Sequence, residues 1–140
     1  MDYKEVFGEI LSKTNEIALA TSVDGVPNVR IVNFCFESGK PELLYFASDR
    51  ENRKVSETKV NNKIAFTTVP HDGIPHVRSN DAIAVKSKRS INDLKDLFIT
   101  KIPGYDETIA AIGDCLDVFE IHIKNAFVVV DFENAGPVSF

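Results

Sequence analysis

The sequence predicts a mainly β fold of the α+β class, in which antiparallel strands form a closed or partly closed barrel with small helices between them. Short segments rich in β-branched and aromatic residues recur along most of the chain, and turns rich in Gly and Pro separate them. Helical periodicity is confined to a few short segments. Closely spaced strands of this kind are typical of an antiparallel barrel.

Length and composition predict one domain, residues 1–140. Apolar residues make up 44% of the chain and charged residues 26%, as in an ordinary globular protein. The net charge of -5 argues against general binding of nucleic acid or of an anionic membrane, since both need a basic face. The first residues do not form a signal peptide, and no apolar run has the length of a membrane span. We therefore expect a cytoplasmic protein without nucleic-acid or membrane partners.

The cysteines and histidines predict neither a disulfide framework nor a metal site. Cys35 and Cys115 lie in or beside predicted strands, so we expect buried, reduced thiols. His71 and His76 flank a turn and are expected at the surface, and His122 is expected on the outer face of a strand. No pair of residues is convincing as a catalytic acid and base, and we assign no catalytic residue.

The opening third of the chain predicts one helix and three strands. Apolar residues recur at helical spacing over Tyr3–Thr14, which predicts an amphipathic helix. Branched and aromatic residues then predict strands, with turns at Asp24–Pro27 and Ser38–Pro41. The expected strands are Ile17–Thr21, Val29–Phe36 and Glu42–Ala47.

The remainder predicts four more strands and two more short helices. Gly and Pro residues predict a hairpin turn over Pro70–Pro75, and Ser79–Asp81 predicts a bulge in the following strand. The segment Ser90–Asp93 resembles a helix start with an acidic residue at its third helical position. The helices are expected around Leu94–Phe98 and over Glu107–Ile112, and the strands over Ile64–Val69, His76 to about Ser87, Leu116–Ile123 and Phe127–Phe132.

The segment Leu43–Val60, LLYFASDRENRKVSETKV, predicts a site for an anion. An apolar strand leads into a polar turn and then into a helix with Arg53 and Lys54 in its first turn. The start of a helix offers unpaired N–H groups and the positive end of the helix dipole. With the side chains of Ser48 and Asn52 nearby, this turn would suit a phosphate group.

A structural interpretation competes with the phosphate site. The spacing Ser48-Asp49-Arg50-Glu51 also fits a capping box, in which Glu51 would reach back to the cap residue. Charges on a short helix also often form only a solvated face. The spacing alone leaves both interpretations open.

Arg30 strengthens the phosphate hypothesis. It lies within an apolar strand, where a cation is costly to bury unless it pairs with an anion or a carboxylate. Its guanidinium group matches the geometry of phosphate oxygens. Alternatively, Arg30 points to solvent from the polar face of the strand.

The order of four segments resembles a known family. LATSVDGVPNVRIVNF, LLYFASDRENRKV, IAFTTV and VRSNDAIAV follow one another as in the pyridoxamine 5′-phosphate oxidase-like family of FMN-binding split β-barrels. The resemblance extends from Ile17 to about Val130 and is clearest over Ala18–Val85. It implies an antiparallel Greek-key split barrel of six to seven strands with small peripheral helices, and FMN as the cofactor.

The resemblance also implies a role for particular residues. Arg30 would contact the FMN phosphate, and Lys54 is the strongest phosphate candidate in the helix. Asn52 stands where the family has Ser, which keeps a hydrogen-bonding side chain. The implied cofactor-binding residues are Arg30 for the phosphate, Ile31, Val32 and Asn33 along the flavin edge, Tyr45, Phe46, Ala47 and Ser48 past the ring, and Asn52, Arg53 and Lys54 in the phosphate turn.

Family members are typically homodimers with two FMN molecules at the subunit interface. The resemblance therefore implies contacts from a partner chain around His76–Asn80, where Arg78 matches the Arg of the fifth strand. One departure concerns the substrate, because no Lys or Arg follows Lys124 and the tail instead carries Asp131 and Glu133. Oxidation of a vitamin B6 phosphate is therefore disfavoured.

Three functional hypotheses follow. The first is an FMN-dependent oxidoreductase that uses a small-molecule electron donor or acceptor, as nitroimidazole-reductase relatives do. The second is a non-catalytic flavin-binding or electron-carrier protein. The third is a barrel that binds haem or a deazaflavin in place of FMN. The lack of a catalytic residue is compatible with the first, since the flavin ring itself transfers hydride or electrons.

Overall fold

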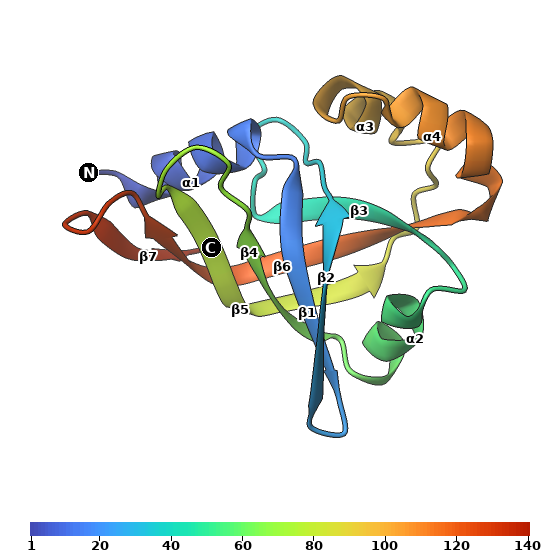
Figure 1. Ribbon diagram of the computed structural model, residues 1–140, viewed down its shortest axis with the longest axis horizontal. Helices are drawn as coiled ribbons and strands as arrows, with labels where there is room; N and C mark the ends of the chain where they lie inside the picture. The colour runs from blue at the N-terminus through green and yellow to red at the C-terminus, as the bar shows by residue number, and fades with distance from the viewer.

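Seven strands and four α-helices form the protein, and the computed structural model describes residues 1–140 without a gap. The strands are β1 (Glu16–Val23), β2 (Val26–Asn33), β3 (Leu43–Asp49), β4 (Lys63–Thr68), β5 (His76–Lys86), β6 (Leu116–Val129) and β7 (Ala135–Ser139). The helices are α1 (Tyr3–Lys13), α2 (Arg53–Val60), α3 (Lys95–Lys101) and α4 (Tyr105–Ile112), and a 3₁₀ turn, η1 (Gly113–Cys115), precedes β6. In Figure 1, α1 lies beside β7, the α3–α4 pair lies over β3, and α2 lies apart from both.

The strands form one antiparallel sheet in the order β2-β1-β4-β5-β6-β3, and β7 pairs with β6. Strands β4, β5 and β6 follow one another as neighbours, and β3 lies beside β6, which is a Greek key. The two ends of the sheet, β2 and β3, are joined only by one bridge, between Cys35 and Tyr45. The barrel is therefore split between β2 and β3, which confirms the fold that the sequence predicts.

Two hydrophobic clusters lie on opposite sides of β3. Leu44 and Phe46 point into the barrel and belong to its core of 21 buried residues, where Phe46 stacks on Phe119 at 5.3 Å between ring centroids. Tyr45 points the other way, into a cluster of nine buried residues beneath α3 and α4, which includes Phe98. Because successive strand residues face opposite sides, β3 is covered on both faces.

The last third of the chain differs from the prediction at two places. The two strands predicted over Leu116–Ile123 and Phe127–Phe132 are one long strand, β6, because the polar residues around Asn125 form part of a bulge rather than a turn. The Asn125 side chain donates to Asp81 Oδ2 at 2.6 Å, and the Ser79 hydroxyl donates to the Asn125 carbonyl at 2.6 Å. The bulge predicted at Ser79–Asp81 is thereby confirmed.

Strand β7 was not predicted, since Gly136 and Pro137 make its sequence unlike a strand. It occupies an edge position, where Pro is tolerated because one side of the strand needs no donor. Gly136 gives room to the Tyr3 ring of α1: a Cβ at this position would lie 2.4 Å from Cε2 of Tyr3, so a larger residue would displace that ring.

Smaller differences concern β2 and the cysteines. Strand β2 covers Val26–Asn33, so it begins and ends three residues earlier than predicted.

Cys35 is buried as expected, and burial raises the pKa of its thiol to about 12. Cys115 is exposed, contrary to the expectation that both thiols are buried. The helix start predicted at Ser90–Asp93 is wrong: these two residues bond each other's backbone N–H groups, but they close a turn, and α3 begins only at Lys95.

None of the four helices is both long enough and apolar enough to cross a membrane.

Candidate functional site

Strand β2 and helix α2 face each other across the split in the barrel, and the sequence of β2 alternates accordingly. Arg30 points inward toward α2, while its neighbours Val29 and Ile31 point outward and are 64% and 55% exposed. Since β2 pairs only with β1, its second edge is open along most of its length. This edge and the first turn of α2 bring together the residues that the sequence predicts as a phosphate site.

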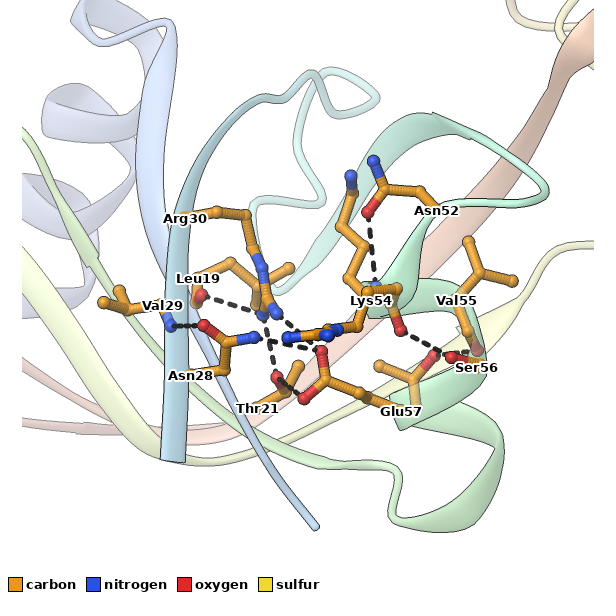
Figure 2. A network of polar contacts seen from close by, with 12 residues as sticks. Leu19, Thr21, Asn28, Val29, Arg30, Asn52, Lys54, Val55, Ser56 and Glu57 are labelled. Carbon is orange, nitrogen blue, oxygen red and sulfur yellow. Dashed lines mark hydrogen bonds and ion pairs between the residues drawn. The ribbon is translucent and has the colours of Figure 1, made fainter. Parts of the chain in front are cut away.

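Arg30 is held by a polar network that anchors α2 to the barrel (Figure 2). Its guanidinium donates to Glu57 Oε1 at 2.8 Å, to the Thr21 hydroxyl at 2.8 Å and to the Leu19 carbonyl at 3.3 Å. Glu57 also accepts from Thr21 at 3.2 Å and from Asn28 at 3.4 Å. The alternative that Arg30 points freely to solvent is therefore wrong, since the side chain pairs with a carboxylate.

Lys54 differs from Arg30 because it has no counter-charge. The stem of its side chain is buried, with 8% of the residue exposed, and its ammonium group reaches solvent without an ion pair or a hydrogen bond to the protein. Burial lowers the pKa of Lys54, the positive charge of Arg30 lowers it further, and Asp49 partly opposes the shift. Figure 2 shows the Lys54 side chain extending away from Glu57. The site thus contains a partly desolvated cation, open to solvent at its ammonium group, that an anionic ligand would stabilise.

Asn52 is the N-cap of α2. Its Oδ1 accepts from the Lys54 backbone N–H at 3.3 Å, which leaves the amide NH₂ without a partner. The capping box considered at Ser48–Glu51 is wrong, since the Ser48 hydroxyl donates to the Asp49 carbonyl and Glu51 does not reach back. Arg53, the first residue of α2, is exposed and makes no ion pair.

The residues of β3 offer backbone groups, rather than side chains, to a ligand in the split. The side chains of Tyr45 and Phe46 lie in the two hydrophobic clusters and are 2% and 1% exposed, and Ser48 is buried as well. The backbone groups of Tyr45 bond to Cys35 across the split, at 2.8 and 2.9 Å. Because backbone direction alternates along a strand, the N–H and C=O groups of Ala47 also point into the split, beyond that bridge.

A hollow of about 580 Å³ on the outer face of the sheet was missed by sequence reasoning. Its floor is formed by small residues, including Ala18 and Ala20 of β1 and Ala65 of β4. Arg78 and Phe127 stand at its side, with the guanidinium carbon 5.1 Å from the ring centroid. The alternation of Ala with buried residues in β1 is the only sequence pattern that marks this face.

Sequence reasoning also missed Glu57, Thr21 and Asn28, the partners of Arg30. No local pattern identifies them, because Thr21 and Glu57 are 36 residues apart in the chain and meet only after β1, β2 and α2 have packed together.

The family model described as pyridoxamine 5′-phosphate oxidase-like matches residues 10–135, so the chain belongs to this family. The resemblance drawn from the sequence is thereby confirmed. A search of curated proteins gives no significant match.

Solved structures share the fold at low sequence identity. A heme binding protein from Mycobacterium smegmatis has a TM-score of 0.80 at 11% identity; the match covers 99% of this chain but only 58% of that one. A NimC/NimA family protein from Clostridium acetobutylicum has a TM-score of 0.71 at 18% identity, with 94% and 88% covered. An FAD-binding protein from Mesorhizobium loti has a TM-score of 0.67 at 15% identity, with 90% and 92% covered.

The Arg30–Glu57 network yields a test of what anchors α2. The substitution Glu57→Gln keeps the shape of the side chain but removes its charge, so we expect the free energy of unfolding to fall by about 1–2 kcal/mol. Urea denaturation measures it. The matched control is Glu51→Gln, at an exposed residue whose side chain has no partner. Equal stabilities of the two variants would contradict the anchoring role.

Proposed function

We propose that the chain is an FMN-binding flavoprotein, and that it acts as an oxidoreductase on a small molecule other than a vitamin B6 phosphate. The observation that carries the proposal is the unpartnered ammonium group of Lys54, which reaches solvent at the end of a buried stem, beside Arg30 and the first turn of α2. A phosphate monoester supplies the missing negative charge. It also accepts several hydrogen bonds at once.

The donors present at this place fit a terminal phosphate. Lys54 offers its ammonium group, Asn52 its free amide NH₂ and Arg53 an exposed guanidinium. Arg30 uses three of its N–H donors on Glu57, Thr21 and Leu19, so two remain for a ligand. The start of α2 adds the helix dipole, which favours a negative charge.

The open strand edges fit the ring of a flavin. Residues Ile31–Asn33 of β2 and Ala47 of β3 border the split, where backbone donors and acceptors have no strand partner. The pyrimidine part of the flavin ring carries alternating carbonyl and N–H groups, which can pair with a strand edge. Val32 is buried beneath this edge and holds it in place.

A bound flavin supplies hydride or electron transfer at its own ring. In the proposal, the chain's residues do not take part in bond breaking. Lys54, Asn52 and Arg53 hold the phosphate, Arg30 is kept in position by Glu57, and the edges of β2 and β3 orient the ring. Tyr45 and Phe46 act indirectly, since their packing on both faces of β3 fixes its backbone.

The segment after Lys124 argues against vitamin B6 phosphates as substrates. No Lys or Arg follows Lys124 in the chain. The turn between β6 and β7 instead carries Asp131, whose pKa is lowered by hydrogen bonds from the Asn134 side chain and from the Glu133 and Asn134 backbone. This turn lies beside α1 and away from α2 (Figure 1), so it brings no cation to the site for a second phosphate. A nitroimidazole-reductase-like enzyme and a non-catalytic electron carrier remain the alternatives within the same proposal.

Haem is a second candidate, because one protein of the same fold is described as a heme binding protein. The histidines do not favour it: His76 lies at the start of β5 with its ring bonded to the Ile74 carbonyl, and His122 is paired with Glu120. Neither is beside Lys54. The anion site instead favours a flavin phosphate.

The free thiols of Cys35 and Cys115 suit a reducing compartment, and we therefore propose that the protein is cytoplasmic.

We further propose that two copies of the chain pair through the outer face of β1, β2 and β4. This face carries the exposed residues Val29 and Ile31 next to the hollow floored by alanines. Pairing would bury these side chains and would bring Arg78 of one copy toward the split of the other.

The homodimer has a direct test. The substitution Ile31→Glu places a charge in the centre of the proposed interface, so we expect the dimer to dissociate to monomers. Light scattering after size-exclusion chromatography measures the mass. Ile112→Glu, on the exposed side of α4, is the control and should stay dimeric. A dimeric Ile31→Glu variant, or a monomeric wild type at micromolar concentration, would rule out this interface.

The phosphate site predicts opposite effects of one substitution on stability and on binding. Lys54→Met removes an unpaired, partly desolvated charge that is repelled by Arg30, so the free energy of unfolding without ligand should rise slightly, by less than about 1 kcal/mol. The same substitution should weaken FMN binding about 10- to 100-fold, because a charge-assisted contact is lost. Denaturation and flavin fluorescence titration measure the two effects. Lys59→Met, on the exposed side of α2, should change neither. Unchanged FMN affinity in Lys54→Met would disprove the assignment.

A further inference from the structure

A second hollow lies at one end of the barrel, between α2 and the strands β5 and β6. It has a volume of about 720 Å³ and is called the barrel-end hollow below. In Figure 1, α2 lies close to the end of β5, and the two elements are in contact. None of the residues assigned to the flavin lines this hollow, so it is separate from the proposed flavin site.

The floor of the barrel-end hollow is apolar. Val55 of α2, Ala84 of β5 and Phe119 of β6 line it, and all three belong to the core of the barrel. Val60 and Val85 add apolar surface at its sides, and Val60 is 73% exposed. The core of the barrel therefore continues to the surface here, and the mouth of a β-barrel is a common place for a small-molecule site.

Three cations surround this floor. Arg50 precedes α2, Lys59 lies in the last turn of α2, and Lys86 ends β5. Two of them share one carboxylate, since Asp117 Oδ1 lies 3.5 Å from the Arg50 guanidinium and Asp117 Oδ2 lies 3.5 Å from the Lys86 ammonium group. The Arg50 guanidinium also donates to the Asp114 carbonyl at 2.9 Å, so its position is fixed twice.

These contacts leave positive charge for a ligand. Asp117 can offset only one of the two cations that it touches, and Lys59 makes no ion pair. The second carboxylate of the hollow is that of Glu51, an exposed residue. With three cations and two carboxylates, the hollow has an excess of one positive charge, although the chain as a whole has a net charge of -5.

An apolar floor with cations at its rim fits a ligand that joins an apolar body to a single negative charge. The body would displace water from the floor, and the gain grows with the apolar area that it covers. The charge would meet Lys59, and the side chains of Arg50 and Lys86, which are 47% and 63% exposed, are accessible to it as well. A dianion would instead be repelled by Asp117 and Glu51 and would gain nothing from the floor.

We propose that the barrel-end hollow binds a small amphipathic monoanion, an aromatic or branched aliphatic carboxylate, with its apolar body against Val55 and Phe119 and its carboxylate at Lys59. This site does not depend on the flavin proposal, because the two sites share helix α2 but no residue. The chain would thus have two anion sites of different chemistry on two sides of one helix.

Benzoate is the probe for this site, and two ligands match it. Benzamide keeps the ring without the charge, and acetate keeps the charge without the ring. Amide chemical shifts recorded during titration of the purified protein should move at Val55, Ala84 and Phe119 with benzoate. Benzamide and acetate should each bind at least about tenfold more weakly, because each lacks one of the two contacts. Saturation with FMN should change the affinity for benzoate less than about twofold, since the sites share no residue.

A charge reversal tests the place of the carboxylate. Lys59→Glu should weaken benzoate binding at least about tenfold, because an attraction becomes a repulsion. Lys95→Glu, at an exposed cation of α3 outside the hollow, makes the same change in net charge. It should alter the affinity less than about twofold, since distant surface charges are screened by salt.

The outcomes separate this proposal from the flavin proposal. Equal affinities for benzoate and benzamide, equal losses in Lys59→Glu and Lys95→Glu, or no shift at about 20 mM benzoate would overturn the barrel-end site. Shifts confined to Arg30 and Lys54, and reversed by FMN, would also overturn it and would support the flavin site. If benzoate binds as expected but FMN does not bind, the flavin proposal alone fails.

Discussion

Strands β2 and β3 meet at a single bridge between Cys35 and Tyr45, and the rest of the structure depends on the gap that this leaves. A fully paired barrel would have no open edge to offer a ligand. Here the chain crosses from β3 to β4 through α2, so the helix begins at the mouth of the gap. The same feature therefore exposes backbone donors and acceptors on two strands and places a helix start beside them.

Of the two cations beside the gap, Arg30 has a carboxylate partner and Lys54 has none, and this difference is the basis of the proposed function. Arg30 is matched by Glu57, whose carboxylate also accepts from Thr21 and thereby fastens α2 to β1 and β2. Lys54 lies beside this pair with a buried stem and an ammonium group that has no partner within the protein. The first cation is satisfied within the protein and the second is free for a ligand, which is the arrangement expected when binding, rather than folding, supplies the counter-charge.

Much of the fold was predictable because its causes are local. The helix over Tyr3–Thr14 and the bulge at Ser79–Asp81 follow from periodicity and from its interruption. The order of segments identified the family, and it pointed to Arg30 and Lys54. The Glu57 partner and the two hollows were not predictable, since each joins residues from strands and helices distant in sequence. Strand β7 was missed because its pairing with β6 overrides a poor strand sequence.

The central claim is that Lys54 and its neighbours bind the phosphate of a flavin, and comparison of FMN with riboflavin tests it most directly. The two ligands share the ring and differ in the phosphate. Calorimetric titration of the purified protein, freed of any bound cofactor, gives both affinities at one salt concentration. The structure predicts that FMN binds at least about 100-fold more tightly, as expected for several charge-assisted contacts. Equal affinities for FMN and riboflavin would contradict the claim.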